Sequence, residues 1–174
     1  WTRGPASNPE RITLTQRTLY PHKPQTELEI ATERPATFAV HLRIPAWAGP
    51  GTTVAVNGKR VAGGVEPGRF LAVQREWRNG DRVEVEFNIP TGLHVVDSQH
   101  PNLLAPVHGP LALFSVGAIP AGLRRADLIA MKQVSAGSTD WQAKTATGTL
   151  ALRPFTAIRD ERYRLYLELP TERS

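Results

Sequence analysis

Hydrophobic and polar residues alternate along much of the first half of the chain, most regularly between Thr37 and Phe87. A period of two lets a β-strand bury one face and expose the other, so the alternation predicts antiparallel strands. Asn57-Gly58 predicts a two-residue type I′ hairpin turn, because this pair tolerates positive φ angles. One apolar face per strand implies two packed layers. In the clearest run, Phe38, Val40, Leu42 and Ile44 alternate with Ala39, His41 and Arg43.

The same pattern over the rest of the chain predicts an all-β fold. We expect an antiparallel β-sandwich, jelly-roll or immunoglobulin-like, with about eleven or twelve strands. The nearly unbroken apolar run 109–116 fits a central strand or a short buried helix, and its flanking glycines favour the strand. In the last strand, 163–169, Tyr163 is expected on the apolar face. The other strands are expected at 12–15, 26–31, 38–44, 53–56, 59–61, 70–74, 82–87, 93–96, 103–107 and 149–154.

The segment 120–137 has the weakest pattern. Pro120 stands at a plausible first helical position, and the apolar residues behind it approach helical spacing, which allows a short helix. Residues 137–140 are rich in turn-forming residues and predict a loop, in which Trp141 would also lie. The helical spacing is that of Leu123, Ala126, Ala130 and Val134.

The chain of 174 residues is long enough for one sizeable core. We expect a linker remnant at 1–10, a β-sandwich accessory domain at 11–170 with a possible subdivision near 92–100, and a tail at 171–174. Hydrophobic residues at 40% and charged residues at 21% are ordinary for a folded soluble protein. Because the chain starts at Trp1 without a methionine or a signal peptide, we expect it to be a segment of a longer protein.

Charge and composition exclude several classes of function. The net charge of +5 and the pI of about 10.1 suggest nucleic acid, but basic residues are mixed with acids, as in Arg82-Val83-Glu84, so no nucleic-acid partner is expected. No apolar run approaches the ~18 residues of a membrane span, so no membrane partner is expected. The absence of cysteine excludes disulfides, a thiol nucleophile and thiolate metal sites.

Several segments in a fixed order resemble the region behind the catalytic barrel of glycoside hydrolase family 127 and the related family 146, the β-L-arabinofuranosidase group. The resemblance covers roughly residues 11–169. The matching segments are Gln16-Arg17-Thr18-Leu19-Tyr20-Pro21, Leu42-Arg43-Ile44-Pro45-x-Trp47, Val56-Asn57-Gly58, Arg75-x-Trp77-x-x-Gly80-Asp81, His108-Gly109-Pro110-Leu111 and the block from Phe155 to Tyr166.

This resemblance implies a C-terminal β-sandwich region detached from its enzyme. The enzymes of the group hydrolyse their substrates in a helical barrel that uses a cysteine nucleophile, a glutamate and zinc-binding cysteines. This chain has no cysteine and lacks the barrel region, so no catalytic residue is predicted. The implied partner is the catalytic barrel of the same parent chain. The implied parent reaction is hydrolysis of β-L-arabinofuranosyl or similar linkages in plant-type glycans, and a secreted or periplasmic location would suit it.

Two other functions remain open: an autonomous carbohydrate-binding module and a protein-interaction sandwich. A module of the first kind needs a row of exposed aromatic rings, because sugar C–H faces stack on such rings. The candidates are Trp141, Trp47 and Trp77. Trp47 and Trp77 stand beside turns, where tryptophan usually fills the end of a core and donates its indole N–H to a carbonyl. Trp141, expected in a loop, is the better candidate for exposure.

Other titratable residues give weaker signals. The histidines, at 22, 41, 94, 100 and 108, lack metal-ligand spacing, so neither a metal nor a cofactor is predicted. His41 falls on a polar strand face, whereas His100 and His108 fall at loop or strand-edge positions that suit an interface with the barrel. Glu84 and Glu86 share a strand face at a spacing compatible with glycoside hydrolysis. With Arg82 beside them they fit a solvated face better, and Asp160 is expected to form surface ion pairs with Arg159 and Arg162.

Overall fold

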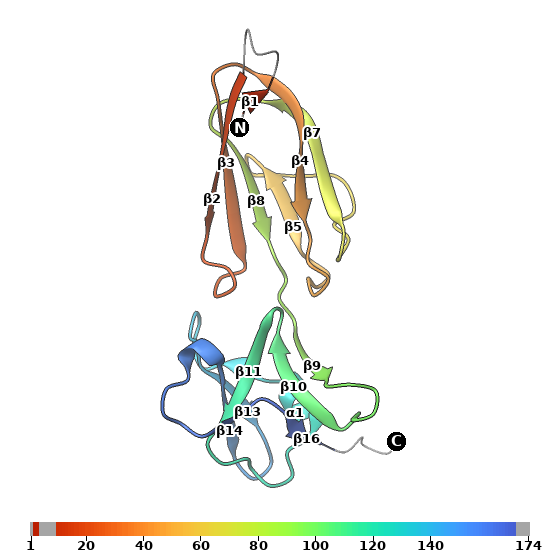
Figure 1. Ribbon diagram of the computed structural model, residues 1–174, viewed down its shortest axis with the longest axis vertical. Helices are drawn as coiled ribbons and strands as arrows, with labels where there is room; N and C mark the ends of the chain where they lie inside the picture. The colour runs from red at the N-terminus through yellow and green to blue at the C-terminus, as the bar shows by residue number, and fades with distance from the viewer. Residues whose placement is uncertain (1, 4–9, 170–174) are drawn as a thin grey trace. The chain divides into compact units, whose positions relative to one another are not determined.

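The computed structural model describes residues 2–3 and 10–169, with side chains from residue 11 onward. Most of the expected linker remnant 1–10 and all of the tail 171–174 lie outside the described residues. The chain divides into two compact units, Trp1–Ile89 and Pro90–Ser174. Both are built from antiparallel sheets, which confirms the all-β expectation (Figure 1).

The first unit is a sandwich of a larger and a smaller sheet. The larger sheet has the order β1-β2-β3-β8-β5-β6, and the smaller contains only β4 and β7. Every strand pair is antiparallel. The strands are β1 (Thr2–Arg3), β2 (Glu10–Thr18), β3 (Gln25–Thr32), β4 (Ala36–Arg43), β5 (Thr53–Val56), β6 (Lys59–Arg60), β7 (Phe70–Trp77) and β8 (Asp81–Glu86).

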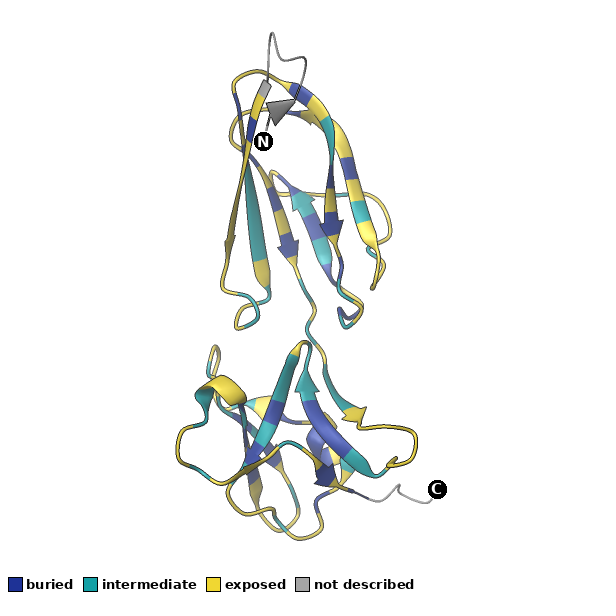
Figure 2. Cartoon of the chain, in the orientation of Figure 1, coloured by how far each residue is buried: buried dark blue, intermediate teal, exposed yellow. Residues whose placement is uncertain are grey.

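The core of the first unit lies between these two sheets. The alternation predicted from the sequence is seen directly in β8, where Val83 and Val85 are buried while Arg82 and Glu84 are exposed (Figure 2). Burial of such side chains contributes about 1.5–3 kcal/mol each to folding. The buried core consists of Ile12, Ile30, Ala36, Val40, Leu42, Ile44, Ala48, Val54, Val56, Val73, Trp77, Val83 and Val85.

The Asn57-Gly58 hairpin is confirmed. Asn57 has φ 50° and Gly58 has φ 75°, the two positive angles that a type I′ turn needs. The turn joins β5 to β6, and the pair Val56 and Lys59 closes it. Asparagine is among the few side chains that tolerate this conformation, which is why the dipeptide is informative.

The second unit is one curled sheet with a short helix. Its strand order is β12-β13-β14-β11-β10-β16, with β15 paired to β11 and β9 to β10. β11 is central, as the apolar run at 109–116 predicts. The elements are β9 (Thr91–Val95), β10 (Leu103–His108), β11 (Leu111–Val116), α1 (Arg125–Ile129), β12 (Lys132–Gln133), β13 (Trp141–Lys144), β14 (Thr149–Pro154), η1 (Phe155–Ala157), β15 (Tyr163–Arg164) and β16 (Leu167–Glu168).

The core of the second unit is enclosed by this sheet and α1. A sheet with one apolar face has to curl around its own core or meet another layer, and here α1 and the curl together cover the face. The buried residues are Leu104, Leu113, Leu123, Leu128, Met131, Trp141, Ala143, Leu150, Leu152, Leu167 and Leu169. Of the described helices, none has the length and apolar character that crossing a membrane requires.

The short helix that the sequence allows in this segment is present, but its buried face differs from the one that the spacing indicates. Within α1 the buried side chains are Asp127 and Leu128, whereas Ala126 and Ala130 are exposed. Val134 is 56% exposed and lies beyond the helix. The helix has only five residues, so the periodicity over 123–134 covered mostly non-helical backbone.

Two predictions for the second unit, a loop at Trp141 and a continuous strand at 163–169, were wrong. Trp141 opens the strand β13 and is buried, because it pairs with Leu152 on the inner face of the sheet. The expected strand 163–169 is interrupted between β15 and β16, so Tyr163 is exposed while Leu167 is buried. The described residues contain sixteen strand segments, more than expected, since β1, β6, β12, β15 and β16 have two residues each and are too short to show alternation.

Candidate functional site

An open apolar groove runs along one side of the first unit. Only β4 and β7 cover the larger sheet, and the inner face of β2 and β3 is left partly uncovered beside β4. Leu14 on this face is 50% exposed, although its cross-strand neighbour Ile30 is fully buried. The groove has a volume of about 680 Å³, and its apolar walls include Leu14, Leu28, Val40, Leu42 and Val85.

Three half-buried aromatic rings form a cluster where strands of the first unit end. Tyr20 and Phe87 line the groove, and Trp47 contacts both. The Tyr20 and Trp47 rings are stacked, with centroids 5.8 Å apart and planes 12° apart. Burial raises the pKa of Tyr20, so its hydroxyl stays a neutral hydrogen-bonding group. Since Tyr20 covers one face of Trp47, this tryptophan fills the end of the sandwich as expected, and sugar binding by it stays a prediction.

The groove offers few polar groups. Gln16 and Thr26 lie on its wall, and His41 and Arg43 come from β4. His41 is exposed, as its place on the polar strand face predicts. Hydrolysis of a glycoside generally requires two carboxyl groups held about 5–9.5 Å apart, and no lining residue of the described groove carries a carboxylate. The groove therefore suits contact with an apolar surface.

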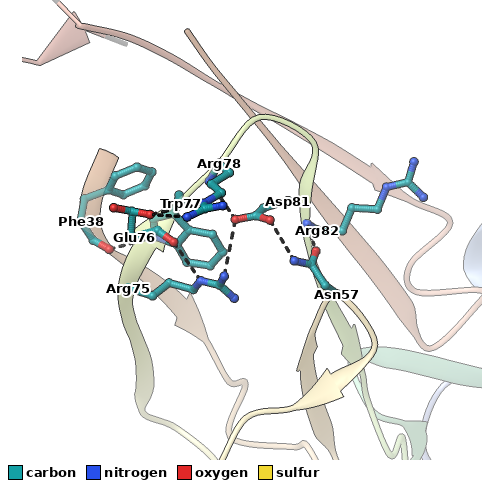
Figure 3. A network of polar contacts seen from close by, with 8 residues as sticks. All are labelled: Phe38, Asn57, Arg75, Glu76, Trp77, Arg78, Asp81 and Arg82. Atoms are coloured by element: carbon teal, nitrogen blue, oxygen red, sulfur yellow. Dashed lines mark hydrogen bonds and ion pairs between the residues drawn. The ribbon is translucent and has the colours of Figure 1, made fainter. Parts of the chain in front are cut away.

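Two segments that carried the family resemblance meet in a polar network (Figure 3). Asn57 Nδ2 donates to Asp81 Oδ1 at 2.8 Å, and the backbone N–H of Arg82 donates to Asn57 Oδ1 at 2.9 Å. The backbone N–H of Arg78 donates to Asp81 Oδ2 at 2.9 Å. Asp81 thus ties the β5–β6 turn to the β7–β8 turn, and Arg75 lies 3.8 Å from the same carboxylate.

The carboxylate of Asp81 is only 11% exposed, and its pKa lies below the usual value. Burial is the largest single influence and acts to raise the pKa. The hydrogen bonds from Arg78 and Asn57, together with the charge of Arg75, outweigh it. Asp81 is therefore ionised in the folded protein at neutral pH, and its charge holds the two turns together.

Trp77 is part of the same network and is fully buried. Its indole N–H donates to the carbonyl of Phe38 at 2.9 Å, and the two rings lie 5.9 Å apart. The guanidinium of Arg75 lies 5.2 Å from the centre of the indole. This is the core-filling role expected for a tryptophan beside a turn. The ring presents no free face to a sugar.

Trp141 is also buried, at 6% exposure, so the expectation that it is exposed was wrong. Its ring lies 4.4 Å from that of His108, between centroids. His108 is half-buried, and among the described residues its buried Nδ1 has no hydrogen-bond partner. Burial lowers the pKa of His108, because the charged imidazolium is poorly solvated there.

We expect the second unit to lose stability as the pH falls below the ordinary histidine pKa of about 6.5. The folded pKa of His108 is lower than that of the unfolded chain, so the unfolded state binds more protons in this range. Stability is retained above pH 6.5 and decreases until the pH reaches the folded pKa. Urea unfolding between pH 5 and 8 measures the loss. His108→Leu should remove this dependence, whereas the same change at exposed His94 should leave it in place.

The remaining titratable candidates are dispersed over the surface. His22, His94 and His100 are exposed, and His100 Nδ1 lies 2.8 Å from Asp97. Glu84 and Glu86 are exposed on β8, in keeping with a solvated face. The ion pairs expected for Asp160 are not formed within the described part of the chain, where Glu161 pairs with Arg153 instead. No group of three or more His, Asp or Glu side chains suited to a metal occurs among the described residues.

Sequence reasoning missed an exposed aromatic cluster in the second unit, made of Phe114, Phe155 and Tyr163. Phe114 lies in the strand expected to be covered on both faces, Tyr163 was expected on the apolar face of an alternating strand, and Phe155 follows β14 directly. The interruption of 163–169 at Leu165, which the alternation did not reveal, turns Tyr163 outward.

Comparisons with known proteins give a family match for the first unit. Residues 5–89 match the family model described as Beta-L-arabinofuranosidase, GH127 middle domain. The comparison with curated protein sequences gives no match. The position expected within the family is therefore corrected for these residues, since the family model describes them as a middle domain and not as a C-terminal one.

Solved structures share the fold over most of the chain. A structure titled glycoside hydrolase is 18% identical and a GH127 beta-arabinofuranosidase is 22% identical; in both cases the TM-score is 0.66 and the match covers 92% of this chain and 32% of the other. A GH127 beta-L-arabinofuranosidase from Geobacillus stearothermophilus T6 is 17% identical, with a TM-score of 0.66 and coverage of 92% and 31%. The chain thus spans about a third of the length of these proteins. The family match thus covers residues 5–89, where the chain is similar to the middle domain of the GH127 β-L-arabinofuranosidase family, and the likeness of the remaining residues to these structures is one of fold.

Proposed function

We propose that the chain is an accessory portion of a GH127-type glycoside hydrolase and that the groove of its first unit packs against the catalytic domain of the same parent protein. The observation that carries this proposal is the groove itself, with half-exposed Leu14 on an apolar wall. Its physical role is to stabilise the catalytic domain and to shape one wall of the substrate cleft. The parent reaction would be hydrolysis of β-L-arabinofuranosyl or similar linkages in plant-type glycans.

Burial of apolar area supports the docking role. Covering an apolar surface contributes roughly 25 cal/mol per Å² removed from water. The groove combines apolar walls with few polar groups, so a partner that fills it pays little for desolvation. The length of the similar structures, about three times that of this chain, supports a partner within the same protein.

The test compares Leu14→Asp with Phe70→Asp in the parent protein and in the 174-residue chain. Phe70 is 65% exposed and does not line the groove, so it is a matched control for adding a charge to a strand of the same unit. We expect Leu14→Asp to lower the thermal unfolding temperature of the parent's catalytic domain by several degrees, since about 1 kcal/mol shifts it by roughly 2–4 °C. In the isolated chain both substitutions should have small effects.

Hydrogen exchange gives an independent readout. Strands β2 and β4 should exchange more slowly in the parent protein than in the isolated chain, because the groove between them is covered. Equal exchange in both proteins, together with a parent that tolerates Leu14→Asp as well as Phe70→Asp, would show that the groove is not the docking surface.

A further inference from the structure

The second unit carries three aromatic rings on the outer face of its sheet. Phe114 lies in β11 between inward-facing Leu113 and Ser115, which are buried, so its own side chain points to the opposite face. The ring centroids of Phe114 and Phe155 are 5.6 Å apart, as are those of Phe114 and Tyr163, and Phe155 and Tyr163 are 6.1 Å apart. Each ring thus contacts the other two.

These rings are open to solvent. Phe155 is 60% exposed and Tyr163 is 48% exposed, with Phe114 half-buried beneath them. Exposing two large aromatic side chains side by side costs free energy that a binding partner recovers by covering them. The mutual contacts also restrict the rings, so less conformational entropy is lost when a ligand binds.

A cluster of ion pairs borders the rings. Arg153 is the cross-strand neighbour of Phe114, and its Nε donates to Asp140 at 2.7 Å. The same guanidinium also pairs with Glu161, whose other carboxylate oxygen accepts the backbone N–H of Arg159 at 2.8 Å. Arg153, Asp140 and Glu161 are each between 30% and 43% exposed, so these planar groups are fixed in place and still reachable.

This combination fits the chemistry of a sugar. A sugar ring has C–H faces that pack on aromatic rings and hydroxyl groups that both donate and accept hydrogen bonds. The carboxylates of Asp140 and Glu161 supply hydrogen-bond acceptors, and the planar guanidinium of Arg153 supplies donors. A protein surface laid over the rings would have to desolvate the three paired charges, which is costly, whereas sugar hydroxyls can replace the hydrogen bonds of water.

We propose that Phe114, Phe155 and Tyr163, with Asp140, Arg153 and Glu161 beside them, form a binding site for a neutral oligosaccharide in the second unit. Among the residues of the proposed site one guanidinium faces two carboxylates, so their combined charge does not favour an anionic sugar. The ring planes meet at 48°, 78° and 79° and provide no flat platform. The site therefore takes single soluble chains and not the flat surface of a crystalline polymer. It is independent of the groove in the first unit.

The experiment is an NMR titration of the isotope-labelled 174-residue chain with arabino-, xylo-, galacto- and cello-oligosaccharides. We expect saturable shifts of the aromatic signals of Phe114, Phe155 and Tyr163 with at least one of these series. Phe155→Ala and Tyr163→Ala should each weaken that binding by about tenfold, which corresponds to about 1.4 kcal/mol. Both residues are exposed, so the variants should keep the dispersed spectrum of the folded chain. Phe70→Ala, which removes an equally exposed ring from the first unit, should bind normally.

Three results would overturn the proposal. One is an absence of shifts with all four series. Another is binding that Phe155→Ala and Tyr163→Ala leave unchanged. A third is protection of the three rings by self-association or by another part of the parent protein, detected as loss of their solvent accessibility without any sugar, which would make the cluster a protein interface.

Discussion

Replacing Trp77 by alanine is expected to lower the unfolding free energy of the first unit by about 3–5 kcal/mol. Trp77 is fully buried, and its indole N–H donates to the carbonyl of Phe38 at 2.9 Å. Alanine would leave a large cavity and remove the hydrogen bond to the Phe38 carbonyl, and each adds to the cost. Small domains are stable by only about 5–15 kcal/mol, so the first unit should lose a large part of its stability. Urea denaturation followed by circular dichroism measures the change.

Two further variants separate the causes. Trp77→Phe keeps a buried ring but removes the N–H donor, so it should lower the unfolding free energy less than Trp77→Ala does. The difference between the two variants measures the contribution of the extra side-chain volume that alanine removes. Trp141→Ala, at 6% exposure in the other unit, should destabilise the second unit instead. NMR signals assigned to each unit show which one unfolds first. If Trp77→Ala left the first unit as stable as before, the core role of this ring would be wrong.

Local patterns predicted much of the fold. Alternation placed β3, β4 and β8 close to their observed bounds, because each is long enough to show a period of two, and the apolar run 109–116 placed β11. The Asn57-Gly58 turn was predictable because its backbone angles suit very few residue pairs. Trp77 was predicted to fill a core end, and the structure supplies the carbonyl that its N–H requires.

Features that depend on distant parts of the chain were not predictable in the same way. The groove exists because two strands cover a wider sheet, and no local pattern in β2 reveals how many strands lie opposite it. The burial of Trp141 depends on pairing with Leu152 and on the ring of His108. The alternation of Trp141, Gln142, Ala143 and Lys144 was a signal for β13, but the turn-rich residues before it favoured a loop.

The residues behind the family resemblance carry structure more than chemistry. Asn57 comes from one segment and Trp77 and Asp81 from another, yet they meet in one network that joins two turns. A motif of this kind identifies a domain because its turns need these side chains to fold. It does not by itself indicate a reaction, and the groove and the aromatic cluster involve other residues.

Asp81 should therefore be the polar residue of the first unit that is most sensitive to substitution. We expect Asp81→Asn to lower its unfolding free energy by about 2–3 kcal/mol at pH 7, because the amide places an N–H₂ against the donors of Asn57 or Arg78. Urea unfolding measures the loss, and Asp160→Asn, at an exposed carboxylate, is the matched control. Combining Asp81→Asn with Asn57→Ala should give a combined loss smaller than the sum of the two, as expected for residues in contact.

The pH dependence of the same variant tests the charge. The folded pKa of Asp81 lies below the value of about 3.9 expected in the unfolded chain, so its contribution is present above that value and is lost as the pH falls through the folded pKa. Wild-type stability should therefore decrease with acid more steeply than that of Asp81→Asn, and the two should converge at the lowest pH. Parallel curves for the two proteins would mean that the ionised carboxylate does not hold the turns together.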